Sequence, residues 1–174
     1  MREYDFILKF RLAEASTAPG RFVDALAAGG CDDATVGIGR RGRIALNFTR
    51  EARSALEAVR SAVRDVKRAI PGVQLVEAAP DFVGLSDVAD LIGCTRRNIR
   101  KLMITNIATF PVAVHEGTQS LWHLRPVLDW FAETQKRSID RGLVEVSGVT
   151  MKINIASDAR RASGAEKDIE AMLA

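Results

Sequence analysis

Residues 85–103, LSDVADLIGCTRRNIRKLM, constrain the fold most, because their pattern predicts two short helices joined by a tight turn. Ser86 is expected to begin the first helix, since a serine hydroxyl suits an N-cap, and Gly93 is expected to end it. Thr95 is a second N-cap candidate, and apolar residues recur at helical spacing along one side of each helix. The segment therefore predicts two helices that each bury one side and leave the other exposed.

The spacing within this segment fits a helix-turn-helix. Ala89 is small where the two helices would cross, and Gly93 follows four residues later, where the turn needs a positive φ. Ile99 and Leu102, three residues apart, lie on the side of the second helix that would enter the core. The alternative interpretation is an ordinary corner of two helices whose basic side is solvated.

The other side of the second helix is strongly cationic, which suits a helix that meets a polyanion. Residues in its first turn can reach base edges in the major groove, where arginine pairs with guanine and asparagine with adenine. Other polar and cationic residues of the helix are expected to hold phosphates. We predict base reading by Arg96, Arg97 and Asn98, and phosphate binding by Thr95, Arg100 and Lys101.

Residues 1–79 alternate between strand and helix patterns. Strands are expected at 4–12, 35–38, 43–49 and 73–77, and helices at 19–28 and 51–70. The inward side expected for the second of these helices comprises Ala52, Leu56, Val59, Val63 and Val66. The order β-α-β-β-α-β is typical of a ferredoxin-like sandwich, in which both helices cover one face of an antiparallel sheet. Since this fold leaves the function open, we expect a domain for dimerisation, for an effector or for a protein partner.

Two short motifs in this domain are similar to ligand-binding sequences. GIGRRG at residues 37–42 matches GxGxxG, but a strand pattern follows it, whereas a dinucleotide site needs a helix N-terminus there. RGRIALNF at 41–48 is similar to the third-strand motif of an RNA-recognition domain, yet Arg43 and Ala45 stand where bases would need aromatic rings. We therefore predict a hairpin turn and no RNA site.

A β-hairpin wing is predicted after the two helices of the opening segment. Residues 112–115 and 120–124 have strand patterns on either side of a polar tip, residues 116–119. Another helix is expected directly after this hairpin, with Trp122 and Trp130 packed together beneath the wing.

The sequences GLSDVADLIGCTRRNIRKLM and FPVAVHEGTQSLWHLRPVLDWF lie within residues 84–131. They resemble the small winged helix-turn-helix domains of the MerR-like superfamily, in particular the AlpA/excisionase-like DNA-binding proteins. The resemblance implies that the second helix enters the major groove and that the hairpin touches the minor groove or the backbone. It adds four residues to the predicted DNA-binding set, namely Ser86, Thr118, Gln119 and Ser120. Because the tip carries Glu116 and no lysine or arginine, base reading is expected to fall on the helix.

Residues 138–174 allow two interpretations. Alternating apolar residues at 149–155 indicate a strand, whereas apolar residues spaced by three and four over 139–153 indicate a helix. We favour a helix over 140–162, because no neighbouring strand is evident to pair with a single edge. Such a helix is apolar enough to need a partner, and we expect a second copy of itself, with a short helical tail at 165–174.

The composition restricts the classes of function. The 174 residues carry a formal net charge of +3, so nucleic-acid binding must rest on clustered charge rather than on the total. Cys31 and Cys94 lack CxxC partners, and no apolar run is long enough to span a membrane, so we expect a cytoplasmic protein with reduced thiols. His115 and His123 have no partners at metal-ligand spacing, and no catalytic constellation stands out. We expect no metal, no cofactor, no membrane association and no enzymatic activity.

These patterns predict an α+β protein of three segments. A ferredoxin-like βαββαβ domain is expected at 1–79, a winged helix-turn-helix at 80–137 and a helical segment that could dimerise at 138–174. The predicted function is sequence-specific binding of double-stranded DNA by a dimeric, bacterial-type transcriptional regulator that reads the major groove with residues 95–103. Two alternatives remain open: an excisionase-like factor that bends DNA, and an antitoxin-like module that binds another protein.

Overall fold

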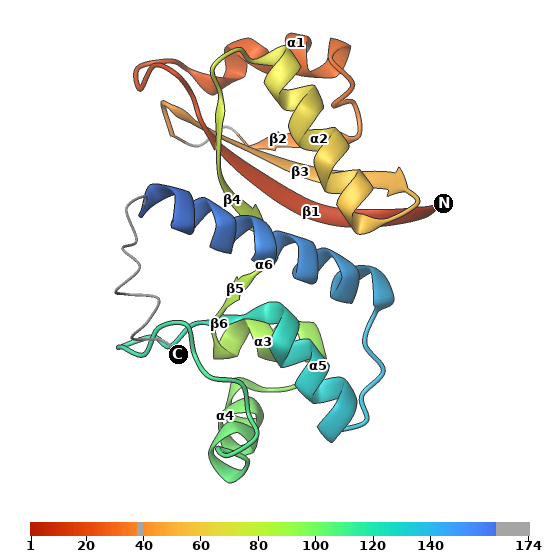
Figure 1. Ribbon diagram of the computed structural model, residues 1–174, viewed down its shortest axis with the longest axis vertical. Helices are drawn as coiled ribbons and strands as arrows, with labels where there is room; N and C mark the ends of the chain where they lie inside the picture. The colour runs from red at the N-terminus through yellow and green to blue at the C-terminus, as the bar shows by residue number, and fades with distance from the viewer. Residues whose placement is uncertain (38–39, 163–174) are drawn as a thin grey trace.

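The computed structural model describes residues 1–37 and 40–162, and this part of the chain confirms the predicted α+β class. Residues 1–79 form β1 (Arg2–Arg11), the short 3₁₀ helix η1 (Pro19–Phe22), α1 (Val23–Ala28), β2 (Ala34–Gly37), β3 (Arg43–Ala52), α2 (Ala55–Ala69) and β4 (Gln74–Ala79). The following residues form β5 (Phe82–Val83), α3 (Leu85–Ile92), α4 (Arg96–Thr105), β6 (Trp122–His123), α5 (Leu124–Thr134) and α6 (Arg141–Arg161). Figure 1 shows the larger sheet with α1 and α2 in one part of the molecule and α3, α4 and α5 in the other.

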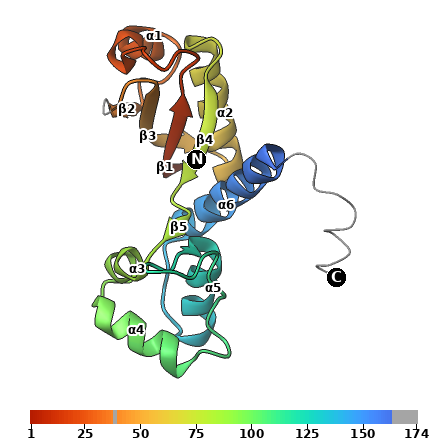
Figure 2. The same cartoon turned by 90° about the vertical axis from the view of Figure 1, so that its left-hand side faces the viewer.

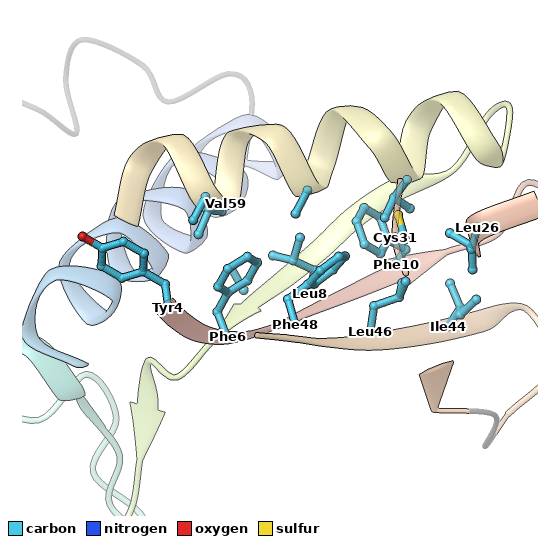
Figure 3. Packing of buried hydrophobic residues seen from close by; sticks show 14 of the residues in the cluster. Tyr4, Phe6, Leu8, Phe10, Leu26, Cys31, Ile44, Leu46, Phe48 and Val59 are labelled. Atoms are coloured by element: carbon cyan, nitrogen blue, oxygen red, sulfur yellow. The ribbon is translucent and has the colours of Figure 1, made fainter. Parts of the chain in front are cut away.

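The larger sheet has the strand order β2-β3-β1-β4, and every neighbouring pair is antiparallel. On β1, the even-numbered residues from Tyr4 to Phe10 are buried beneath α2, as the alternation in the sequence predicts (Figure 3). Phe6 and Phe48 face each other across β1 and β3 and stack with 5.2 Å between their ring centroids. The odd-numbered side chains of β1 point to the opposite face, which is mostly exposed.

The start of α2 differs from the predicted helix over 51–70. β3 runs on to Ala52, and Ser54 then caps the helix by accepting a hydrogen bond from the Glu57 backbone N–H at 3.2 Å. Leu56, which was expected to face inward, is 58% exposed. Alanines take three of the six buried positions of α2. The buried residues of α2 are Ala55, Ala58, Val59, Ala62, Asp65 and Val66.

The GIGRRG motif does not lead into a helix. β3 begins at Arg43, directly after Gly42, whose φ of 72° lies in the left-handed region. A strand therefore follows the glycines, as predicted for a hairpin. Residues 38–39 of this motif, and the tail expected at 165–174, lie outside the described residues.

α6 crosses between the larger sheet on one side and helices α3, α4 and α5 on the other (Figures 1 and 2). The helix predicted over 140–162 is confirmed, with Asp140 as its N-cap. Val146 is buried in the core of the larger sheet, whereas Leu143 and Val144 pack against the core that contains α5. The chain itself covers several apolar residues of α6, whereas Ile155 is 49% exposed. The second copy that we expected beside this helix stays a prediction.

A buried polar network fixes α6 to β4 and to Asp81, which follows β4. Asn154 donates to the Ala78 carbonyl and accepts from the Ala78 N–H, both at 2.8 Å, and it also donates to Asp81 at 2.8 Å. Asp81 is 1% exposed, and its other carboxylate oxygen lies 2.8 Å from His123 Nδ1 in β6. These contacts tie β4, β6 and α6 together, because each buried polar group in the network needs its partner.

Candidate nucleic-acid interface

α3 begins two residues earlier than predicted. Gly84, not Ser86, occupies the N-cap, and the Asp87 carboxylate accepts a hydrogen bond from the Gly84 N–H at 2.7 Å. Ser86 instead lies in the first turn of the helix, where its side chain is exposed. The Asp87 carboxylate favours this helix start, because its negative charge lies at the helix N-terminus and its oxygen satisfies the backbone N–H of the N-cap residue.

The turn between α3 and α4 is held by Gly93 and Thr95. Gly93 has a φ of 70°, and the next N–H, that of Cys94, donates to the Ala89 carbonyl at 2.9 Å and closes α3. Thr95 caps α4 by accepting a hydrogen bond from the Asn98 N–H at 3.2 Å. Both residues have the roles that the sequence predicted for them.

The inner sides of α3 and α4 share one hydrophobic core. Ala89 is 3% exposed and Ile99 is fully buried, as predicted for the crossing point and for the residue that anchors the second helix. Leu102 and Met103 are partly buried against the same core. This packing fixes the rotation of α4 about its axis and so determines which side chains it turns to solvent.

The outer side of α4 is a cluster of positive charge. Arg96, Arg97, Arg100 and Lys101 are all exposed, and none of them forms an ion pair with another described residue. α4 itself contains no acidic residue that could neutralise them. The helix lies at the end of the molecule remote from the larger sheet, in both views (Figures 1 and 2). We call these four side chains the α4 cations.

A depression of about 740 Å³ runs along α4 and is lined by five of the six contacts predicted for residues 95–101. Arg96 does not line it, because successive helical residues are separated by about 100° around the axis and Arg96 is turned away from Arg97. Sequence reasoning missed three lining residues, although they continue the three- and four-residue spacing of the lining side. The depression is lined by the predicted Thr95, Arg97, Asn98, Arg100 and Lys101 and by the missed Cys94, Ile104 and Thr105.

The wing is much smaller than predicted. The strand expected at 112–115 is reduced to a single bridge between His115 and Leu121, and Val112 is 89% exposed. β6 pairs with β5 instead of forming a long hairpin, because Val83 and Trp122 come opposite each other there and are both buried. Of the residues expected at the tip, Thr118 and Gln119 are exposed and Ser120 is partly buried.

Trp122 and Trp130 meet through a third ring. Phe110 lies edge-on to both, with centroid distances of 6.0 Å to Trp122 and 5.0 Å to Trp130. The indole of Trp122 also donates to the Pro111 carbonyl at 3.0 Å. The expected direct pair is therefore a three-ring cluster, and it anchors the chain that leaves α4. Sequence reasoning gave Phe110 no role, since an isolated aromatic in a loop has no periodic pattern around it.

The chain matches no protein-family model, no curated protein and no solved structure. Within residues 1–37 and 40–162, no helix combines the length and the apolarity needed to cross a membrane. The same residues contain no group of three histidine, cysteine, aspartate or glutamate side chains that could hold a metal ion.

Proposed function

We propose that the protein binds double-stranded DNA by inserting α4 into the major groove. The observation that carries this proposal is the two-sided character of α4, whose buried side is fixed in a core while its outer side carries the α4 cations. An α-helix fits the width of the major groove, and cations near the phosphates gain affinity by releasing counterions. Cations that stabilise no other described part of the chain are free to do this.

The proposal also specifies the fold type of each part of the chain, and it places the protein in the cytoplasm. The strand order β2-β3-β1-β4, with α1 and α2 packed together, supports a ferredoxin-like sandwich for residues 1–79. The two capped helices, followed by the bridge between His115 and Leu121, support a winged helix-turn-helix with a short wing for residues 80–137. The MerR-like, AlpA/excisionase-like resemblance of residues 84–131 is part of the same proposal.

Within this proposal the side chains of α4 have separate roles. Arg97 and Asn98 lie in the first turn and line the depression, so we assign base reading to them. Ile104, 58% exposed beside these polar groups, suits contact with a thymine methyl group. The remaining residues hold the DNA backbone: Thr95, Arg96, Arg100 and Lys101 on α4, with Ser86, Thr118, Gln119 and Ser120 around it.

We further propose that two copies bind together, as a transcriptional regulator. One α4 can contact only a few base pairs, which gives too little discrimination among competing sites. Two copies would place their α4 helices in half-sites about 34–36 Å apart along one face of the duplex.

A protein-binding module is the second candidate, and one observation favours it. Four aliphatic side chains between residues 104 and 114 are exposed, and side chains of this kind suit contact with a protein partner where they form one patch. Their exposed fractions are 58% for Ile104, 79% for Ile107, 89% for Val112 and 50% for Val114. Co-purification of a stoichiometric protein partner, without duplex binding, would favour this candidate.

The test begins with selection of genomic fragments by the purified protein, followed by titration of the selected duplex at several salt concentrations. We expect salt-dependent binding, and we expect Arg97→Ala to lower specific affinity by about 1–3 kcal/mol, roughly 5- to 150-fold. Arg60→Ala is the matched control, because Arg60 is an exposed arginine of α2, remote from α4. Equal loss on a scrambled duplex would remove base reading from Arg97, and absence of any salt-dependent binding would overturn DNA binding altogether.

A further inference from the structure

A second depression, of about 750 Å³, lies between β4, α2 and the C-terminal half of α6. Figure 2 shows α6 extending beyond the sheet on the side of α2, with its last turns away from α3, α4 and α5. A volume of this size is typical of sites for small molecules. We call this depression the β4–α6 groove. It is separate from the α4 depression, with which it shares no lining residue.

The β4–α6 groove is lined by cations from four elements. They are Arg11 of β1, Arg43 of β3, Lys67 of α2, and Arg160 and Arg161 of α6. No carboxylate lines the groove among the described residues. Apart from Arg161, which pairs with Asp158 at 3.0 Å, these cations form no ion pair with a described residue. Like charges that converge around one concavity repel each other, so a bound anion would lower the electrostatic energy of the groove.

The free edge of β4 at this groove is not open to an added strand. Asn154 already bonds both backbone groups of Ala78, and Arg161 donates to the Val76 carbonyl at 2.7 Å. Strand addition needs a row of free backbone groups, and α6 side chains occupy two positions of that row. A compact occupant therefore fits the groove better than an extended peptide.

The side chains that line the groove restrict the chemistry of the uncharged part of a bound anion. Between the cations lie aliphatic side chains, among them Val63, Leu75 and Ile153, which are partly buried against the core. No aromatic ring lines the groove among the described residues, so a nucleobase would find no stacking partner. An aliphatic body would bury its surface against these side chains while its charged end meets the cations.

We propose that the β4–α6 groove binds a small organic anion with an aliphatic body and a phosphate or carboxylate head. This inference does not rest on DNA binding. The groove is nevertheless connected to the rest of the molecule, because α6 carries two of its arginines and also packs against the core that contains α5.

The full-length chain is titrated by calorimetry with octyl phosphate and with octanoate, each below its micelle concentration. Inorganic phosphate tests the head alone, and octyl glucoside tests the aliphatic body without a charge. We expect saturable binding of at least one octyl anion, with affinity at least about tenfold above that of inorganic phosphate and of the glucoside. A preference between the phosphate and the carboxylate then distinguishes the two possible heads.

Charge reversal locates the site. Lys67→Glu and Arg160→Glu should each weaken the preferred octyl anion by at least about tenfold, because an attractive charge in the groove becomes repulsive. Both side chains are exposed, and thermal unfolding checks that each variant is folded. Arg60→Glu, on α2 but outside the lining, is the matched control and should leave the affinity unchanged.

Three results would overturn the proposal. Absence of saturable binding of either octyl anion at millimolar concentration removes the ligand. Equal binding by wild type, Lys67→Glu and Arg160→Glu places the ligand elsewhere. If the octyl anions do not bind but the two variants weaken binding of a duplex, the groove is a phosphate-backbone contact and not a small-molecule site.

Discussion

Arginines in two regions of this protein have opposite surroundings. Arg50 of β3 is buried and pairs with Asp33 at 2.6 Å and with Asp65 at 2.9 Å. Burial by itself lowers the pKa of Arg50, but the hydrogen bonds and charges of these two aspartates outweigh it and raise the pKa above its ordinary value. The α4 cations are exposed and have no such partners among the described residues. The positive charge of Arg50 therefore stabilises the fold of residues 1–79, whereas the charges of α4 have no such role among the described residues.

The largest effect that we expect comes from Arg50→Met. The substitution leaves Asp33 and Asp65 without their shared partner, and the Gly30 carbonyl also loses its donor at 2.7 Å. Breaking a buried pair in this way should lower the free energy of unfolding by about 3–5 kcal/mol. Chemical denaturation, followed by circular dichroism, measures the change.

Arg68→Met is the control for this comparison. Arg68 pairs with the same Asp65, but its side chain is 63% exposed, so we expect a loss below about 1 kcal/mol. Similar losses for Arg50→Met and Arg68→Met would show that burial does not determine the value of these pairs. A large loss of stability on removal of an α4 cation would also contradict the comparison, because it would show that an exposed cation of α4 stabilises the fold.

Two glycines extend the comparison from charge to the backbone. Gly42, before β3, and Gly93, between α3 and α4, have nearly the same φ, 72° and 70°. A Cβ at Gly42 would lie 2.8 Å from the Ala15 carbonyl oxygen, whereas a Cβ at Gly93 would meet nothing within 4 Å. We expect Gly93→Ala to cost about 1 kcal/mol from backbone strain alone, and Gly42→Ala about 2 kcal/mol more from the added clash. Equal losses in denaturation experiments would show that crowding near Ala15 is relieved by loop movement.

Much of the α3–α4 region was predictable because its signals are local. Thr95 caps its own helix, Gly93 meets a local need for a positive φ, and Ile99 follows helical spacing. Competing local interactions explain why the starts of α3 and α2 were predicted at the wrong residues. At α3 the bond from the Gly84 N–H to Asp87 favours a start two residues before the one predicted, and β3 extends through residues that were expected to begin α2.

The features that sequence patterns missed depend on contacts between distant residues. β6 pairs with β5, some forty residues earlier, and this pairing takes the strand that was expected to build the wing. Asn154 is 76 residues from Ala78, whose two backbone groups it bonds. The β4–α6 groove gathers cations from four elements, so no window of sequence contains its pattern.

The smallest expected effect is that of Lys101→Ala. Lys101 is an exposed member of the α4 cations, so its removal should change the free energy of unfolding by less than about 0.5 kcal/mol. If it neutralises one phosphate, the slope of log affinity against log salt should fall by about 1, with nearly the same loss on specific and scrambled duplexes. Titrations at four salt concentrations measure the slope, with Lys136→Ala as the control, because Lys136 is an exposed lysine outside α4. An unchanged slope would show that Lys101 neutralises no phosphate. Any phosphate contacts of α4 would then come from its other three cations.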